Sequence, residues 1–397
     1  MATPRVALVT EHWGAAPSEA VTVTRLLAGA LARSASVEVV HLTHAPRRPA
    51  GGRDSVFGLH ELPVTSERHL HEALVRTALA RAGRPLSPAL EAVAAPFATV
   101  EGLAGTLAAI APDAIVLTGH EAPLDPADLE ATGVPLTFVP ILGDLGRIGE
   151  QRIARLVDGA SRVLSVNPAE EEALRARYPA RSGAIVPLEL ALPLNRAATG
   201  HMLFGVHWFG RYVLLIRSFP PGGHRYARSV TRELLSSLLG VSVAEVDGER
   251  FTISDRDNAV DLPVNPTRVN LWRLMAHAAV TIDARPAGPF GQEAIESLLL
   301  GTPVVVPAGS AAHAVARASG GGLSYVEPGD LVDAARSLLR PGAGEEAGAA
   351  GRSWAETTHG DAERFVTHLA GVVLGGGRQA VAASSPAAMP SRMSDSE

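Results

Sequence analysis

Short apolar runs alternate along most of the chain with longer segments that repeat apolar residues at helical spacing. The run "RVALVT" (5–10) ends at turn residues, as buried strands of parallel sheets do. Segment 20–32 has helical periodicity, and the apolar run at 37–42 follows it closely. Strand, helix and strand in this order predict a βαβ unit, and repeated units predict a parallel sheet covered by helices.

The first half of the chain continues this alternation to about residue 188. Its predicted strands are 5–10, 37–42, 114–119, 136–142, 162–166 and 183–188. Its predicted helices are 20–32, 68–83, 99–111, 148–158 and 168–177. Segment 45–55, rich in Gly, Pro and Arg, is predicted to be a loop.

A second series follows a predicted linker at 193–209. Its predicted strands are 212–219, 241–246, 279–284 and 303–307. Its predicted helices are 226–239, 268–278, 290–300, 330–340 and 352–374. The polar segment 247–266 is expected to consist of turns.

Two successive α/β series predict an α/β protein with two Rossmann-like, doubly wound domains that face a cleft. We assign 1–195 to an N-terminal domain and 210–345 to a C-terminal domain. A C-terminal helix is expected over 346–375, and a disordered tail rich in Ser, Ala and Pro over 376–397. Ligands of such folds bind beyond the carboxyl ends of the strands, so a site between the domains is expected.

Charge and composition narrow the class of protein. The 397 residues include 35 basic and 41 acidic side chains, and the net charge of −6 argues against nucleic-acid or anionic-membrane binding. Each of these basic residues is Arg, because the sequence has no Lys, so a Schiff-base lysine and a P-loop lysine are excluded. A phosphate group would have to be held by Arg, His, backbone N–H groups or helix ends.

Cysteine is absent, which excludes disulfides, thiolate chemistry and Cys-based zinc sites and fits a cytoplasmic protein. No apolar run is long enough to span a membrane. The apolar run near the N-terminus is too short for a signal peptide, and we expect none. The His residues are scattered, and no metal site is predicted.

The segment 287–307, "AGPFGQEAIESLLLGTPVVVP", joins a Gly-Pro turn, an apolar helix with two carboxylates and a buried strand. The first N–H groups of this predicted helix lack internal partners and can bind an anion. Glu293 and Glu296 are three residues apart and share one helix face. They are candidates for binding a ligand, and the alternative is that they balance the helix dipole at the surface.

This segment resembles the donor-nucleotide motif of GT-B retaining glycosyltransferases of the GT4 type. The residues that match the motif in register are Phe290, Gly291, Glu296, Gly301, Pro303, Val304 and Val305. The resemblance implies that Glu296 binds the ribose hydroxyls, and that the amides from Phe290 to Gln292 bind the donor sugar or phosphate. The sequence departs from the motif at Gly288, where the family has a carboxylate that contacts the donor sugar. Glu293, one turn along, is a candidate catalytic residue that takes part of this role.

The segment "VLLIRSFPPGGHRYA" extends the resemblance to the diphosphate. It places Arg217 at the position of an Arg that binds the donor diphosphate in the family. The Lys that follows in the family is replaced here by Gly222. Arg225, or His224 beside it, is a candidate to supply that charge.

In the first domain the resemblance concerns the loops after two predicted strands. The segment "EHWGAAPSEA" resembles a Gly-rich loop, and Gly14 is its best match for a backbone that approaches the donor phosphate or the acceptor. The segment "PDAIVLTGHEAP" resembles a strand that ends in a His-Glu pair, which implies that His120 lies beside the donor sugar. Asp144 is the polar candidate after the next strand.

The resemblance implies a hexosyl-type glycosyltransferase that uses a nucleotide-diphosphate sugar, retains configuration and needs no metal or other cofactor. The acceptor, the sugar, the base and the oligomeric state are left open. Because Gly288 and Gly222 replace charged residues, a catalytically degenerate partner or nucleotide-sugar binding module is the alternative. A sugar-nucleotide epimerase of the same fold is a third possible function. The sequence "DRD" (255–257) matches the D-x-D metal signature of another glycosyltransferase fold, which three residues match easily by chance.

Overall fold

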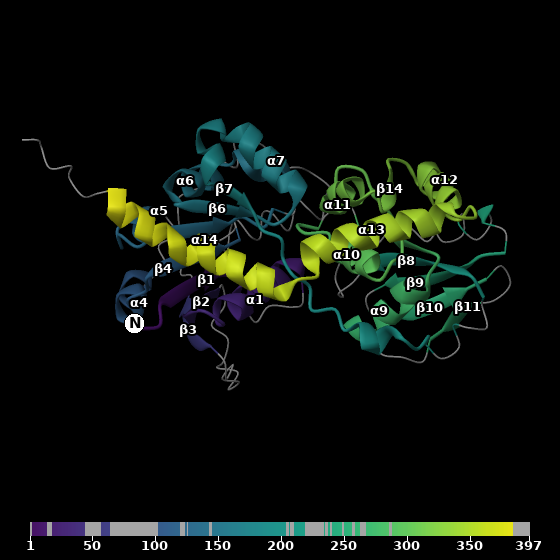
Figure 1. Cartoon of the computed structure of the whole chain (residues 1–397), viewed down its shortest axis with the longest axis horizontal. Helices are drawn as coiled ribbons and strands as arrows, with labels where there is room; N and C mark the ends of the chain where they lie inside the picture. The colour runs from purple at the N-terminus through teal and green to yellow at the C-terminus, as the bar shows by residue number, and fades with distance from the viewer. Residues whose placement is uncertain are drawn as a thin grey trace, which may run out of the picture.

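The computed structural model contains two sheets, one in each half of the chain (Figure 1). It describes residues 2–13, 18–43, 57–63, 102–119, 124, 126–142, 145–203, 206, 210–218, 234, 237–238, 240–247, 250–255, 259–262, 267–285 and 288–383. The helices predicted at 68–83 and 226–239 lie wholly or mostly outside these residues.

The first sheet has seven parallel strands in the order β3-β2-β1-β4-β5-β6-β7. Its strands are β1 (Arg5–Thr10), β2 (Ser36–Thr43), β3 (Gly58–Pro63), β4 (Ala114–Thr118), β5 (Leu136–Val139), β6 (Arg162–Ser165) and β7 (Ile185–Pro187). Its described helices are α1 (Glu19–Leu31), α4 (Leu103–Ile110), α5 (Pro126–Glu130), α6 (Gln151–Gly159) and α7 (Pro168–Arg177), with 3-10 turns at Leu145–Gly149 and Pro179–Ala184.

Helices cover both faces of this sheet, because its central strands are apolar on both sides. In β1, Val6 and Leu8 pack into the core beside α1, whereas Ala7 and Val9 pack into the core beside α4, α6 and α7. A continuous apolar run of this kind is typical of a parallel strand buried on both faces. The sequence pattern of "RVALVT" therefore leads directly to the central position of β1.

The second sheet has the order β11-β10-β9-β8-β12-β13-β14. Its strands are β8 (Tyr212–Ser218), β9 (Ser242–Asp247), β10 (Phe251–Ser254), β11 (Ala259–Asp261), β12 (Val280–Asp283), β13 (Val304–Pro307) and β14 (Gly322–Tyr325). Its helices are α9 (Arg268–His277), α10 (Gln292–Leu299), α11 (Ala311–Ser319), α12 (Pro328–Leu338) and α13 (Ala343–His359), and a 3-10 turn at Arg196–Thr199 precedes β8.

One prediction in this domain is wrong. The segment 247–266 contains β10 and β11, which pair antiparallel and continue from β9, in place of turns alone. Phe251 and Ile253 are buried and alternate with less buried residues, so β10 has the period-two pattern of a half-buried strand. Because this pattern extends over only four residues among polar neighbours, the sequence around it is dominated by turn signals.

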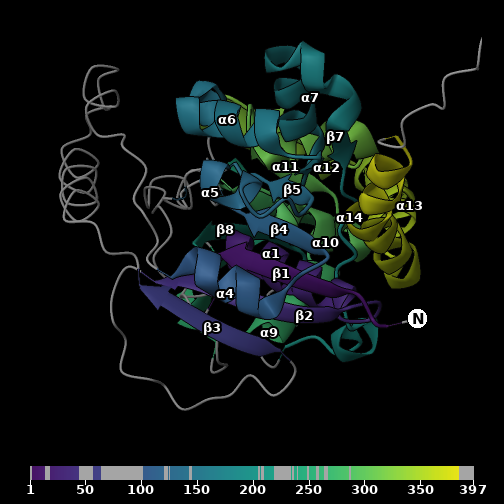
Figure 2. The ribbon, with the colours of Figure 1, turned by 90° about the vertical axis from the view of Figure 1, so that its left-hand side faces the viewer.

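The C-terminal helices connect the two domains. α13 packs against α10 and α11 of the second domain, whereas α14 (Ala362–Ala383) lies against α1 of the first, and both are yellow in Figure 1. Figure 2 shows them together along one side of the molecule. α13 begins in a Gly-, Ala- and Glu-rich segment, where Gly348 allows close packing because a Cβ there would lie 2.2 Å from the Gly301 carbonyl oxygen. α14 continues to Ala383, past residue 375 where the tail was expected to begin.

Candidate functional site

The loop before α10 lies where the two domains touch. The Glu19 carboxylate, at the start of α1, accepts hydrogen bonds through Oε2 from the N–H groups of Phe290 at 2.8 Å and Gly291 at 3.3 Å. Asn167, at the start of α7, donates from Nδ2 to the Pro289 carbonyl oxygen at 2.6 Å. Two helices of the first domain thus contact the amino end of one helix of the second.

The backbone at this point requires its glycine. Gly291 precedes α10 with φ of 72°, in the left-handed region, and a Cβ there would lie 3.0 Å from the backbone of Ala312. The preceding Phe290 is fully buried, and its ring meets the His359 ring edge to face at 6.0 Å between centroids. Conformation and packing together aim the two N–H groups at the first domain.

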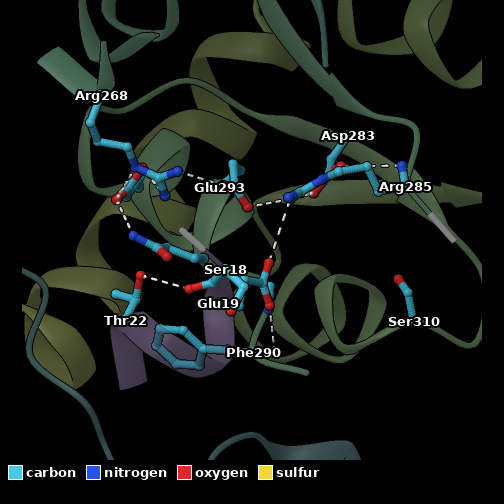
Figure 3. A network of polar contacts seen from close by, with 12 residues as sticks. Ser18, Glu19, Thr22, Arg268, Asp283, Arg285, Phe290, Glu293 and Ser310 are labelled. Carbon is cyan, nitrogen blue, oxygen red and sulfur yellow. Dashed lines mark hydrogen bonds and ion pairs between the residues drawn. The ribbon is translucent and has the colours of Figure 1, made fainter. Parts of the chain in front are cut away.

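Glu19 reaches this loop from the first turn of α1, which Ser18 caps by accepting from the Val21 N–H. The side chain is buried, and its Oε1 lies 3.6 Å from Arg285 Nη2. Figure 3 shows the carboxylate between Arg285 and the backbone of Phe290. Burial, together with the negative charge of Glu293, raises the pKa of the Glu19 carboxyl to about 7.

Arg285 is the cation at the centre of a buried network (Figure 3). It follows β12 and binds Asp283 at the end of that strand, from Nε at 2.8 Å and from Nη2 at 2.7 Å. It also binds Glu293, which accepts a further hydrogen bond from Arg268 Nη1 at 2.6 Å. Burial by itself would raise the pKa of Glu293, but the two guanidinium groups outweigh it and hold this pKa at about 2.

Arg268 links Glu293 to Glu296 across the face of α10. Its Nε donates to Glu296 Oε1 at 3.0 Å, and its Nη2 faces Oε2 at 2.8 Å as an ion pair. Gln292 Nε2 also donates to Oε1 at 2.9 Å. Burial raises the pKa of Glu296 despite Arg268, and the carboxylates of Glu296 and Glu293 raise the pKa of Arg268 despite its own burial.

The structure brings some of the predicted site residues together and places Arg217 elsewhere. Glu293, Glu296, Gln292 and the amides of Phe290 and Gly291 lie in one network at the start of α10. Both glutamates are fully buried, so the alternative of surface charges that balance the helix dipole is wrong. Three further predicted residues, Gly14, His120 and Arg225, lie outside the described residues, as does Asp144.

Arg217 occupies a different position from the network around α10. It lies in β8, is 8% exposed and forms an ion pair with Glu245 of the neighbouring strand β9. Its predicted contact with a diphosphate would therefore require the guanidinium to exchange or share its carboxylate partner. Burial of a charge is costly unless it is paired, which explains why Glu245 accompanies Arg217.

The sequence patterns did not identify five residues of this network and its contacts: Glu19, Asn167, Arg268, Asp283 and Arg285. Asp283 and Arg285 follow a predicted strand, where side chains reach the ligand-binding edge of a sheet, and this signal could have identified them. Glu19 and Asn167 resemble ordinary helix-start residues, whose local roles conceal contacts with another domain.

No model of a known protein family matches the sequence, and no curated protein matches it. Among solved structures, sucrose-phosphate synthase from Thermosynechococcus elongatus is similar, with a TM-score of 0.60 and 15% identity over 96% of this chain and 100% of the other. HepE from Anabaena, in complex with UDP and glucose, has a TM-score of 0.59 and 12% identity over 92% and 98%. An α,α-trehalose-phosphate synthase (UDP-forming) from Burkholderia vietnamiensis has a TM-score of 0.56 and 13% identity over 93% and 99%.

These similarities show the fold. The predicted fold class, two Rossmann-like α/β domains in the GT-B arrangement, is confirmed. Within the described residues, no helix is long and apolar enough to cross a bilayer. In that same part of the chain, no group of three or more His, Asp or Glu side chains is arranged to hold a metal ion.

Proposed function

We propose that this protein is a retaining glycosyltransferase of the GT4 type that transfers a sugar from a nucleotide-diphosphate sugar. One observation carries the proposal: the N–H groups of Phe290 and Gly291 point at the first domain and bind an oxygen acceptor, the Glu19 carboxylate. The resemblance assigns these amides to the donor, and we propose that they act on it through the Glu19 carboxylate that they hold. The fold supports the same function, because similar structures include HepE with UDP and glucose and a UDP-forming synthase.

The reaction requires stabilisation of a leaving nucleotide diphosphate. The bond between the anomeric carbon and the phosphate oxygen breaks, and the diphosphate leaves with the electron pair. The acceptor hydroxyl forms the new bond to the anomeric carbon, and its proton passes to the departing diphosphate oxygen. Fixed N–H groups and guanidinium groups stabilise such developing charge without reorganising. We assign the diphosphate to Arg217 and Arg225, with the amino end of α10 directed at the donor.

The remaining predicted residues orient the donor in this proposal. Glu296 would hold the ribose hydroxyls, which requires it to share Arg268 and Gln292 with the ligand. His120 would orient the donor sugar, and Gly14 would allow close approach of the backbone. Contact of both domains with residues 289–291 would exclude water, which otherwise intercepts the glycosyl donor. With amides and Arg in these roles, the proposed reaction uses no metal ion.

A binding module without catalytic activity is the second candidate. It is favoured by Gly288, which lacks a carboxylate, and by Glu19, which occupies the N–H groups that the donor would use. Both candidates bind a nucleotide sugar, so binding alone does not separate them. Only a catalyst accelerates release of the nucleotide diphosphate from its sugar.

The test is a thermal-shift screen with UDP-, GDP- and ADP-glucose, followed by assay of free nucleotide diphosphate for each ligand that binds. We expect one nucleotide sugar to stabilise the protein and to be hydrolysed slowly in the absence of an acceptor. Arg217→Gln is expected to lower the affinity about tenfold or more, because a charge-assisted contact is lost. Arg211→Gln, at an exposed position just before β8, is the control and should keep the affinity. If a folded sample responds to none of a broad set of nucleotide sugars, the donor site is wrongly assigned.

A further inference from the structure

The side chain missing at Gly288 has a counterpart in space. A Cβ built on Gly288 would lie 2.9 Å from Glu19 Oε1 and 3.0 Å from Oε2. A side chain at 288 and the carboxylate in its present position therefore exclude one another. The Glu19 carboxylate occupies the space that an acidic side chain at position 288 would fill, although it comes from the other domain.

The two oxygens of this carboxylate have different surroundings. Oε2 accepts both N–H groups of the loop, from Phe290 and Gly291, and is fixed by them. Oε1 is buried and has no hydrogen-bond partner among the described residues, and its nearest cation is Arg285 Nη2 at 3.6 Å. Buried oxygens of this kind are nearly always hydrogen-bonded, so Oε1 is an acceptor in need of a donor.

The charges around Oε1 decide which ligand suits it. Four carboxyl groups, those of Glu19, Asp283, Glu293 and Glu296, surround the two guanidinium groups of Arg268 and Arg285. Both cations already bind carboxylates, so a phosphate could bind here only in electrostatic competition with these groups. A neutral hydroxyl group can donate a hydrogen bond to Oε1 at no such electrostatic cost.

We propose that Glu19 supplies, from the first domain, the carboxylate that the loop before α10 lacks, and that its Oε1 accepts a hydrogen bond from a hydroxyl group of the donor sugar. This inference rests on the proposed function and sharpens it: the donor sugar lies against Oε1 of the Glu19 carboxylate, and the diphosphate lies elsewhere. Because Glu19 belongs to α1, the sugar contact forms only when the two domains are together.

The test compares nucleotide sugars with the matching nucleotide diphosphates. Affinities of UDP-, GDP- and ADP-glucose, and of UDP, GDP and ADP, are measured by calorimetry for the wild type and Glu19→Gln. The amide of Gln keeps the size of the side chain but replaces one acceptor oxygen with a donor. We expect about a 10- to 100-fold loss for the nucleotide sugar that binds, and no change for its diphosphate, because the lost contact is to the sugar. Glu172→Gln, at an exposed ion pair with Arg317, is the matched control and should change neither.

A second experiment moves the carboxylate back to the loop. Gly288→Glu alone is expected to lower the thermal unfolding temperature, because its side chain meets the Glu19 carboxylate. The double variant Glu19→Ala with Gly288→Glu should recover stability, and it should bind the nucleotide sugar more tightly than Glu19→Ala alone. The unfolding temperatures in this experiment can be compared without any catalytic activity.

The outcomes distinguish failure of the proposed function from failure of the sugar contact. If the wild type binds no nucleotide sugar, the proposed function fails, and the sugar contact fails with it. If the wild type binds but Glu19→Gln changes sugar and diphosphate affinities alike, or neither, then Glu19 only joins the domains. If Glu19→Gln tightens binding, Glu19 obstructs the donor site, and the proposal is overturned.

Discussion

At the scale of single residues, Arg285 explains how three acidic groups can be buried together. Its side chain is 12% exposed and contacts Asp283, Glu293 and Glu19. A buried ion pair gains little overall, since desolvation offsets the attraction, but removal of one partner leaves a charge uncompensated. Loss of the Arg285 side chain should therefore lower the free energy of unfolding by much more than the net energy of its ion pairs.

We predict that Arg285→Met destabilises the protein by about 3–5 kcal/mol, because it leaves the carboxylates of Asp283 and Glu293 buried without this cation. Methionine keeps much of the side-chain volume, so the change reports mainly on charge. Urea unfolding measures it. The control is Arg33→Met, which removes a half-exposed ion pair with Glu363 and should cost less than about 1 kcal/mol. Equal losses in the two variants would contradict the buried network.

A second prediction at the residue scale concerns His359 and the pH dependence of stability. Burial lowers its pKa from 6.5 to about 4, although Nδ1 hydrogen-bonds to the Leu190 carbonyl oxygen. The folded protein thus holds His359 neutral, whereas the unfolded chain takes up a proton below pH 6.5. This stabilising contribution is complete above pH 6.5 and is lost as the pH falls towards 4.

In His359→Phe the aromatic contact can remain, but the titration disappears. Between pH 7.5 and 5, the wild type should lose about 2 kcal/mol more unfolding free energy than the variant does. The buried carboxyls of Glu19 and Glu170, whose pKa values are raised to about 7, act in the opposite direction in this range. They are present in both proteins, so urea unfolding of the pair at the two pH values isolates the histidine. Identical pH dependence would show that His359 is not held neutral.

At the scale of elements, the start of α7 both caps its own helix and contacts the second domain. Asn167 Oδ1 accepts from the Glu170 N–H as an N-cap, while Nδ2 donates to Pro289 in the loop before α10. Within the same turn, Glu170 accepts the N–H groups of Leu142 and Val166 and so fixes the loops after β5 and β6. One helix terminus thus positions three loops.

The two roles of Asn167 can be separated by substitution. Asn167→Asp keeps an acceptor for the cap but replaces the Nδ2 donor with an oxygen that repels the Pro289 carbonyl. We predict a loss of about 1–3 kcal/mol at pH 7.5 from this unpaired buried contact. Asn195→Asp is the control, because Asn195 also caps a turn but is exposed, and a loss below about 0.5 kcal/mol is expected. Thermal unfolding of the two variants decides the matter, and equal stability would mean that Asn167 acts only as a cap.

At the scale of the whole molecule, one hydrophobic cluster spans the two domains. Leu27 of α1, Phe290 before α10 and Leu369 of α14 belong to the same cluster of buried residues. α14 completes this cluster by returning from the second domain to the first (Figure 1). We therefore expect the C-terminal helices to contribute to the stability of both domains.

The prediction at this scale concerns Leu369, which is fully buried. Leu369→Ala should cost about 2–5 kcal/mol, as large-to-small changes in a packed core do. Leu323→Ala on the edge strand β14 is the control, since Leu323 is 39% exposed, and it should cost less than about 1 kcal/mol. Calorimetry is expected to show a lower unfolding temperature for Leu369→Ala in the transition that includes the first domain. A change confined to the second domain would contradict the packing of α14.

Several elements follow from the sequence because their signal lies within a few consecutive residues. β1 occupies the predicted positions 5–10, and α7 the predicted positions 168–177, which begin with a cap residue and Pro. The short strands β10 and β11 were not predicted, since four and three residues among turn signals give little periodicity. The α13–α14 pair was expected as one helix, although Gly360 separates them.

The sequence by itself determined the α/β class, the two successive series of strands and helices, and the presence of a turn before α10. These are encoded by local periodicity and by glycines that a turn requires. Only the tertiary structure decided which charges meet. Glu19 and Phe290 are 271 residues apart, and an acidic residue in a first helical turn has the same appearance in sequence whether it faces solvent or another domain. Packing of the two domains brings Glu19 to the space beside Gly288, and no pattern within either segment contains that information.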